Sequence, residues 1–345
     1  MSGLRQCAGV ALRVASVSRF FPFGLIAWLA AAAISVSAGD TAKLLRLERS
    51  LDTMGTTYTV TLYGTDQFQL DSAIDDAFDE AKRLEELLSN YRPESEWSRV
   101  NQGAYKAPVP VSLELYALLD RCLDYSRRSD GAFDITVGPL MKIWGFYKNT
   151  EHVPHRAEIR SALDRVGYQH IHLDPKSHTV RFDAPVDIDP GGIGKGYAVD
   201  QMADILRKDG VTSGLISAGR SSIYAIGAPP TEPRGWHILL PNPRDARKNV
   251  WELYLKDESM STSGSTEKFF VAGGKTYSHL MDPRTGNPVQ GMLAVSVVAP
   301  KTLDSEAWTK PYFVLGREWA ARHKPKEFRV FICEDRTEIA CVSLP

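Results

Sequence analysis

A glycine-rich stretch carries the most specific chemistry in the sequence. Residues 187–206 read DIDPGGIGKGYAVDQMADIL, with Lys195 set among the glycines. Closely spaced glycines let backbone N–H groups approach an anion, and the positive end of a helix favours negative charge. The spacing is neither that of a Walker phosphate loop nor that of a clean dinucleotide fingerprint. It predicts a site for a phosphate or pyrophosphate, with a ligand-free turn from strand to helix as the alternative.

Two further stretches place single polar side chains in an unusual setting. The first, SHLMDPRTGNPVQG at 278–291, surrounds His279 with prolines, glycines and charges, so it is either a surface turn or a rigid frame that aims polar groups. The second, SDGAFDITVGPLMKIWGF at 129–146, sets Asp134 among apolar residues just after an expected helix. An acid in such a place is usually a cap or a paired structural group. The histidines of the chain form no pattern typical of a zinc site.

The elements that must position these residues are helices and mostly antiparallel strands. Apolar residues at helical spacing predict helices at 70–91, 112–131, 155–167, 195–210 and 304–323, the last interrupted by Pro311 and Gly316. Alternating and apolar runs predict strands at 53–64, 213–219, 222–227, 235–243, 251–264, 275–282, 294–300, 328–335 and 339–344, and a hairpin followed by a strand within 171–189. The order of elements predicts an α+β protein with a single compact domain.

The overall composition is that of a globular protein. Apolar residues make up 43% of the 345 residues, which is ample for a large core. The formal net charge is −1, so no basic surplus favours nucleic acid as a partner.

The N-terminal segment differs from the rest of the chain. Three arginines are its only charges before Asp40, and an apolar run after them ends in small residues at Ala38. This pattern predicts a secretory signal peptide at 1–38 and a mature domain at 39–345. The lack of a twin arginine before the apolar run favours Sec-type export, to the periplasm or beyond. If the signal were not cleaved, the protein would stay tethered to the membrane.

Removal of the signal peptide would leave three cysteines, too few for a disulfide framework. Cys333 and Cys341 flank the stretch EDRTEIA, which fits a hairpin. The two residues either form a disulfide in an oxidising compartment or stay as buried free thiols.

Seven segments, taken together and in this order, resemble the FAD:protein FMN transferases, also called the ApbE or flavin transferase family. They are MGTTY, LLSNYRPESEWSRVN, GAFDITVGPLMKIWGF, DPGGIGKGYAVD, STSGSTEKFF, YSHLMDPRTGNPV and SEAWTKPYFVLG, within residues 48–320. The resemblance implies an ApbE-like α+β fold and a bacterial, usually exported enzyme. It implies that the enzyme cleaves the pyrophosphate of FAD with Mg²⁺ and joins FMN through its phosphate to a Ser or Thr of an acceptor. Such acceptors are typically membrane-bound redox subunits.

The same resemblance assigns roles to residues of this chain. His279 is similar to a histidine near the transferred phosphate, a candidate base for the acceptor hydroxyl. Pro283 and Gly286 would then stiffen its loop, and Asp282 and Arg284 would pair. The implied flavin-binding residues are Met54, Tyr91, Ala132, Phe133, Asp134, Asp189, Lys195 and Leu280. The implied magnesium ligands are Glu306, Thr309 and the backbone carbonyl of Gly194.

The chain departs from the family pattern at the metal end. The family usually has an Asp and, four residues later, a Thr, where this chain has Glu306 and Lys310. A carboxylate can bind a hard cation, but a charged lysine has no lone pair to offer. Three alternatives follow from this departure. Thr309 or Asp304 takes over as the metal ligand, the charge of Lys310 partly replaces the metal, or metal binding is weakened. Arg220 also stands where the family has glycine, and it either binds a phosphate or blocks the site.

Three functions fit these observations. The first is a Mg²⁺-dependent flavin transferase. The second is an FAD-binding protein or flavin carrier that has lost the transfer chemistry, which the departures at the metal end suggest. The third is an FAD pyrophosphatase that releases FMN and AMP. A flavin-dependent oxidoreductase is disfavoured because the sequence shows no motif for a second redox substrate.

Overall fold

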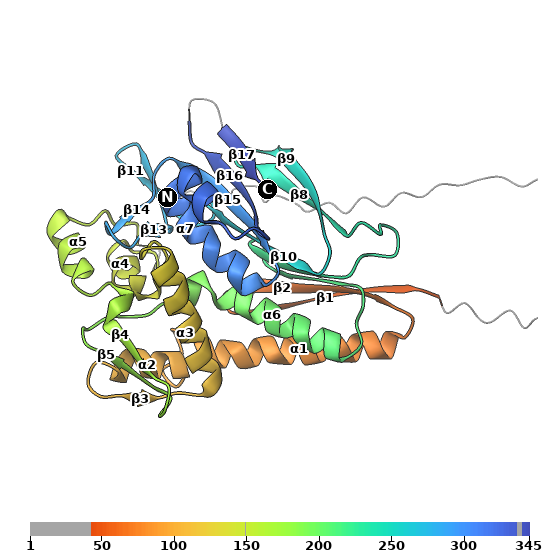
Figure 1. The fold of residues 1–345 in the computed structure, drawn as a ribbon, viewed down its shortest axis with the longest axis horizontal. Helices are drawn as coiled ribbons and strands as arrows, with labels where there is room; N and C mark the ends of the chain where they lie inside the picture. Colours follow the sequence, from red (N-terminus) through yellow and green to blue (C-terminus); the bar gives the residue numbers. More distant parts are fainter. Residues whose placement is uncertain (1–42, 149, 337–339) are drawn as a thin grey trace, which may run out of the picture.

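An eight-stranded antiparallel sheet forms the centre of the fold (Figure 1). The computed structural model describes residues 43–148, 150–336 and 340–345. Along the sheet the strands are β1 (Leu45–Thr53), β2 (Thr56–Gly64), β6 (Gly214–Ala218), β7 (Ser222–Ile226), β10 (Glu258–Gly264), β15 (Met292–Ala299), β16 (Arg329–Glu334) and β17 (Ala340–Leu344). All neighbouring strands pair antiparallel. The predicted α+β class is confirmed.

Three helices cover one face of this sheet. Helices α1 (Gln67–Leu88) and α6 (Gly194–Lys208) share a core with β2, β6 and β7, and α7 (Thr302–His323) packs on β10 and β15. Tyr58, Val60 and Leu62 alternate along β2 and are fully buried in this core. Burial of a large apolar side chain contributes about 1.5–3 kcal/mol, so this layer holds α6 firmly against the sheet.

A β-hairpin covers the opposite face. Its strands β8 (Trp236–Asn242) and β9 (Asp245–Leu255) place Ile238 and Leu253 against Met260, Val298 and Phe331 of the sheet. The central sheet is therefore buried on both faces, and α6 and α7 are held on a rigid platform.

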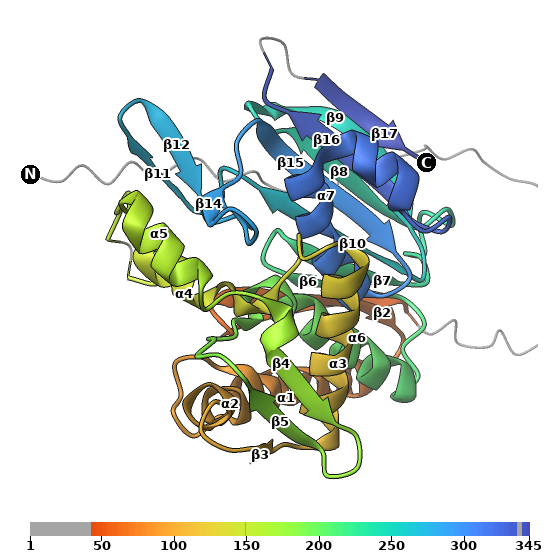
Figure 2. The same ribbon diagram turned by 60° about the vertical axis from the view of Figure 1, so that its left-hand side comes forward.

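A smaller lobe stands beside the sheet (Figure 2). It contains α2 (Glu96–Gly103), α3 (Leu113–Arg128), α4 (Gly138–Ile143), α5 (Arg156–Leu163) and a sheet of β3 (Val109–Pro110), β5 (Thr179–Phe182) and β4 (Ile171–Asp174), with short 3₁₀ turns at Ile135–Val137, Tyr168–His170 and Pro190–Gly192. Two short hairpins, β11 (Phe269–Ala272) with β12 (Lys275–Ser278) and β13 (Met281–Asp282) with β14 (Asn287–Pro288), lie next to α4. Trp144 joins the lobe to these hairpins, because its ring lies 5.3 Å from that of Tyr277.

Four predicted strands differ from the structure. The strand predicted at 275–282 is two strands, β12 and β13, because the chain changes its pairing partner there from β11 to β14. The strand predicted at 53–64 is the second arm of a hairpin, because β1 precedes it and the chain turns at Met54. The strand predicted over 251–264 is two strands, β9 and β10, separated by a turn in which Asp257 has a φ of 55°. The strand expected near the end of 171–189 does not form, because the backbone of Ile188 bonds to the side chains of Trp97 and Asn101.

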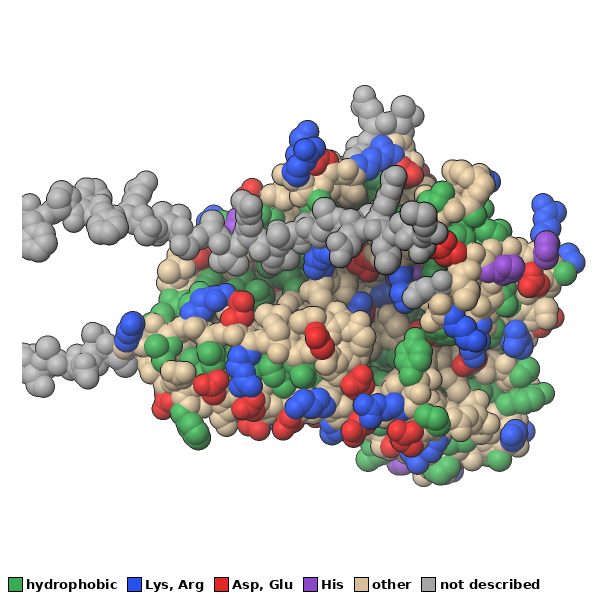
Figure 3. Space-filling view, turned by 180° about the vertical axis from the view of Figure 1, so that it is seen from behind, with side chains coloured by type: hydrophobic (Ala, Val, Ile, Leu, Met, Phe, Trp, Pro, Cys, Tyr) green, Lys and Arg blue, Asp and Glu red, His purple; other side chains and the backbone are tan. Residues whose placement is uncertain are grey.

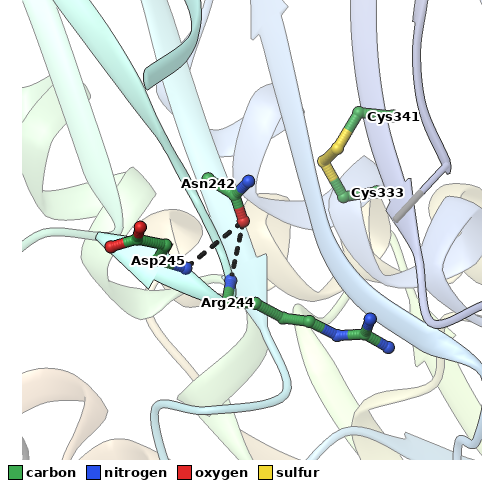
Figure 4. The surroundings of a disulfide bond; sticks show 5 residues. All are labelled: Asn242, Arg244, Asp245, Cys333 and Cys341. Atoms are coloured by element: carbon green, nitrogen blue, oxygen red, sulfur yellow. Dashed lines mark hydrogen bonds between the residues drawn. A yellow bond between two sulfur atoms is a disulfide. The ribbon is translucent and has the colours of Figure 1, made fainter. Parts of the chain in front are cut away.

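Cys333 and Cys341 form a disulfide between the paired strands β16 and β17 (Figure 4). Of the two alternatives left open by the sequence, the bridge is thus the one found. The β8–β9 turn is drawn beside it, where Asn242 accepts hydrogen bonds from the backbone N–H groups of Arg244 and Asp245. Cys122 is a buried free thiol.

The expected signal peptide at 1–38 lies outside the described residues. Within the part of the chain that the structure describes, no helix is long and apolar enough to span a membrane. The face shown in Figure 3 carries basic and acidic side chains interspersed with apolar ones.

Candidate active site

A pocket that is partly open to solvent lies where the glycine turn, the His279 loop and α7 meet. Its wall includes residues 132–135, Asp189, residues 279–281 and Lys310. Apolar groups such as Phe133 dominate one side, while histidine and lysine supply polar atoms, so the cavity suits a ligand with a flat apolar part and an anionic part.

Asp134 orders the segment that forms the apolar side. Its buried carboxylate accepts hydrogen bonds from the backbone N–H and hydroxyl of Thr136 at 2.8 and 2.7 Å, and from the N–H of Tyr168 at 2.7 Å. Burial raises the pKa of Asp134, and the bonds from Thr136 and Tyr168 oppose that rise. Both carboxylate oxygens are thus engaged by the protein. Asp134 lines the cavity while it caps the 3₁₀ turn at Ile135–Val137.

Asp189 fixes the glycine turn in the same manner. One carboxylate oxygen accepts the N–H of Gly191 at 2.6 Å, and the other accepts the amide of Asn90 at 3.1 Å and the hydroxyl of Tyr147. Burial raises the pKa of Asp189. A Cβ atom on Gly192 would come within 3.6 Å of the Lys310 side chain, which shows how near the turn lies to α7.

Gly196 lets α6 and α7 approach each other closely. A Cβ atom at this position would lie 2.6 Å from the backbone carbonyl oxygen of Thr302 and 2.8 Å from the Glu306 carboxylate. The N–H of Gly196 donates to that carboxylate at 2.5 Å. The glycine motif therefore has two roles. Gly191 and Gly192 line the cavity, and Gly196 forms the contact between α6 and α7.

His279 stands at the edge of the cavity with a neutral ring. Its Nδ1 and its backbone N–H lie 3.2 and 2.9 Å from the carbonyl oxygen of Lys268. Burial and, to a smaller extent, the charges of Lys195, Lys310 and Lys268 together lower the pKa of His279 to about 4. An Nδ1–H bonded to the carbonyl leaves Nε2 as the lone-pair nitrogen. The imidazole is therefore held ready to accept a proton at neutral pH.

The loop that follows His279 is a rigid frame and not a loose surface turn. Arg284 makes two side-chain hydrogen bonds of 2.9 Å to Asp282, as expected. Gly286 has a φ of 71°, and a Cβ there would lie 2.7 Å from Ile159. The indole of Trp144 donates to the carbonyl of Gly286 at 2.9 Å. These contacts tie the loop to α4 and α5.

Two of the three groups predicted to bind magnesium, the Glu306 carboxylate and the Thr309 hydroxyl, make other contacts. The Thr309 hydroxyl is buried between Ser263 Oγ at 2.8 Å and the carbonyl of Glu306 at 2.7 Å. Lys310 donates to the same carbonyl at 2.8 Å, so an ammonium group lies beside these donors. Over the described residues, no group of three or more His, Cys, Asp or Glu is arranged to hold a metal ion. The ammonium group of Lys310 beside these oxygen atoms disfavours a divalent cation, and the predicted ligand set stays a prediction.

The structure does not bring every predicted residue to the cavity wall. Six line it, namely Ala132, Phe133, Asp134, Asp189, His279 and Leu280. Met54 lies behind the glycine turn, 3.5 Å from a Cβ built on Gly194. Lys195 acts on His279 through its charge, whereas Tyr91 is 77% exposed and lies outside the wall.

Residues 54–331 match the sequence model of the ApbE family. The chain belongs to the ApbE family. It is 32% identical over 282 residues to the FAD:protein FMN transferase of Salmonella typhimurium, which covers 78% of each chain. It is 30% identical over 319 residues to that of Treponema pallidum, covering 87% of this chain and 88% of the relative.

Solved ApbE structures share the fold. The ApbE protein of Thermotoga maritima superposes with a TM-score of 0.79 at 28% identity, over 86% of this chain and 96% of that one. The flavinyl transferase ApbE of Pseudomonas stutzeri, in its apo form, gives 0.78 at 28% identity, over 88% and 96%. The family and the fold class predicted from the sequence are confirmed.

Some residues of this ApbE site were missed by the sequence analysis. Asn90 and Tyr147 bond to Asp189 across 99 and 42 positions of sequence, and the carbonyl of Lys268 holds His279. Burial raises the pKa of Glu267. The nearby cations Lys195, Lys310 and Arg220 oppose that rise, which shows that Glu267 lies among positive charges. Nothing in the spacing of these residues signals that they meet.

Proposed function

We propose that the chain is an FAD:protein FMN transferase, the activity named for its curated relatives. Membership of the family makes it a transferase. The observation that carries the proposal is that a neutral His279 and the lysine Lys310 line the same cavity. FAD has the two parts that this cavity suits, a flat apolar ring system and an anionic pyrophosphate.

The proposed reaction is phosphoryl transfer to a protein hydroxyl. A Ser or Thr oxygen of the acceptor attacks the phosphorus of the FMN half, the P–O bond to the bridging oxygen breaks, and AMP leaves. The hydroxyl proton passes to Nε2 of His279. Little covalent work falls to the protein in such a reaction, so catalysis depends on positioning and on neutralising the phosphates. In this proposal Phe133 and Leu280 contact the flavin, and the pyrophosphate lies beside the glycine turn and Lys310. The N–H groups of Gly191 and Gly196 do not bind it, because they donate to Asp189 and Glu306.

The finer parts of the proposal rest on the family resemblance. They are the flavin contacts of Met54 and Tyr91, the binding of FAD near Lys195, and an acceptor that is an exported or membrane-bound redox protein. Mg²⁺ is the cation that the resemblance implies, and because the ammonium group of Lys310 disfavours it, we draw no step through a metal.

The site of action proposed is the periplasm or the outside of the cell. The support is the leader at 1–38, which has the basic start, apolar middle and small-residue end of a Sec-type signal. N-terminal sequencing of the protein recovered from the producing cell tests this. A start at Gly39 supports cleavage, and an intact leader indicates a membrane tether.

The transferase proposal is tested by incubating the purified protein with FAD and an acceptor protein that has a flavinylation Ser or Thr. A fluorescent acceptor band that survives denaturation, with AMP released in equal amount, is the expected result. Free FMN and AMP with an unlabelled acceptor would identify a pyrophosphatase. Bound, intact FAD in all conditions would identify a flavin carrier.

The pH dependence of transfer reports on His279. We expect kcat/KM for FAD to fall on the acid side near pH 4, because burial and neighbouring lysines lower the pKa of His279 to about 4. The ring is neutral and can accept a proton above that pKa, and it is protonated and inactive below it. An acid limb near ~6.5, the ordinary value for histidine, would contradict the lowered pKa, and a profile without an acid limb would contradict the role as proton acceptor. Circular dichroism at each pH separates titration from unfolding.

A further inference from the structure

Lys310 places a cationic side chain beside the glycine turn. It projects from α7 into the wall of the cavity, and a Cβ built on Gly192 would lie 3.6 Å from its Cε. An ammonium group has three N–H donors. Among the described residues, the ammonium group of Lys310 donates one hydrogen bond, to the carbonyl oxygen of Glu306 at 2.8 Å. Donor capacity is therefore left for a ligand in the cavity.

Positive charge exceeds negative charge at this end of the cavity. The groups that act electrostatically on Glu267 and His279 include the cations Lys195, Lys268, Lys310 and Arg220, against the carboxylates of Glu306 and Glu267. Asp189 of the cavity wall adds a third carboxylate, which interacts with Lys268. Four cations against three carboxylates leave a net positive charge, which favours an anionic ligand. A divalent cation at the same place would be repelled by the lysines, and it would find the Thr309 hydroxyl already engaged.

We infer that the ammonium group of Lys310 binds the pyrophosphate of the dinucleotide at the point where a divalent cation would otherwise neutralise it, so that FAD binds to this chain without Mg²⁺. This inference rests on the proposed function, because it assumes that FAD occupies the cavity. Lys310 is then a phosphate-binding residue. The proposed transfer step does not need a metal to neutralise these phosphates.

Binding of FAD is the direct test, measured on the full chain by quenching of flavin fluorescence, once with excess EDTA and once with Mg²⁺. The wild-type Kd is expected to change less than about twofold between the two conditions. Lys310→Met should weaken FAD binding in EDTA by about tenfold or more, since a charge-assisted hydrogen bond to the phosphate is lost. Riboflavin has no phosphate, and its binding should be unaltered by the same substitution.

Two further variants make the test specific. Lys208→Met removes the same charge from the exposed C-terminal end of α6 and should leave the FAD Kd unchanged. Lys310→Thr installs the hydroxyl that the family pattern has, and its FAD binding should fall in EDTA and recover with Mg²⁺. This variant also serves if thermal melting shows that the Met variant does not fold.

A wild-type Kd that tightens tenfold or more with Mg²⁺, or a Lys310→Met variant that binds FAD as the wild type does, would overturn the inference and leave the transferase proposal standing. Absence of FAD binding to the wild type in both conditions would refute the transferase proposal itself.

Discussion

Replacement of His279 by alanine should lower the rate of flavin transfer by about 10²- to 10⁴-fold, the usual contribution of a general base. FAD binding should persist, because the cavity keeps its apolar wall, the glycine turn and its lysines. The physical reason is that Nε2 is the proton acceptor of the proposed step, while Nδ1 is occupied by the carbonyl of Lys268. Single-turnover labelling of the acceptor measures the rate, and quenching of flavin fluorescence measures binding.

Two substitutions separate a chemical role of His279 from a structural one. His279→Gln retains an amide that can donate to the Lys268 carbonyl but has no basic nitrogen, so it should be as slow as the alanine variant. His152→Ala removes an exposed histidine that does not line the cavity, and it should transfer at the wild-type rate. If His279→Gln kept most of the activity, or if the alanine variant lost FAD binding in proportion to its rate, proton acceptance by His279 would be refuted.

Gly196→Ala should be the most damaging substitution in the glycine motif. The added Cβ would lie 2.6 Å from the carbonyl oxygen of Thr302 and 2.9 Å from its carbonyl carbon, so the backbone of α7 must move. Overpacking of this kind costs about 1–3 kcal/mol of unfolding free energy. A shift of α7 also moves Lys310, which lies in the same helix, so FAD binding should weaken as well.

Gly194→Ala is the matched control for this substitution. The nearest atom to its Cβ would be Met54 Cε at 3.5 Å, an ordinary contact, and its φ is not positive. Alanine in a helix is favoured over glycine by about 1 kcal/mol, so this variant should be as stable as the wild type or more so. Urea unfolding followed by circular dichroism compares the two. Equal stability of the Gly196 and Gly194 variants would contradict the close approach of α6 and α7.

The elements with a strong local pattern could be predicted from the sequence. Helix α6 was expected at 195–210 and is found at Gly194–Lys208, because its apolar residues recur at helical spacing and Gly210 follows it. Helix α3 was expected at 112–131 and is found at Leu113–Arg128, where the hydroxyl of Ser112 caps it by accepting the N–H of Leu115 at 3.2 Å. The turn at Asp257 was missed because it has neither glycine nor proline to mark it, although its φ is positive.

The site was predictable only in part, for a physical reason. Motif residues such as Phe133 and His279 could be carried over from the family, and the structure places them in one cavity. The partners that determine their chemistry come from elsewhere in the fold, as Tyr147 does for Asp189 and Lys268 for His279. Such contacts depend on tertiary packing, and no local periodicity encodes them.

The cavity is lined both by Ala132 and by Lys310 and Phe313 of α7, which are far apart in the sequence. If the leader proposed at 1–38 directs the unfolded chain through a translocation channel, this cavity is not yet assembled when the chain crosses. The chain would cross the membrane without its nucleotide. The flavin would then have to be met on the far side, and its supply there would set how many acceptor molecules become labelled.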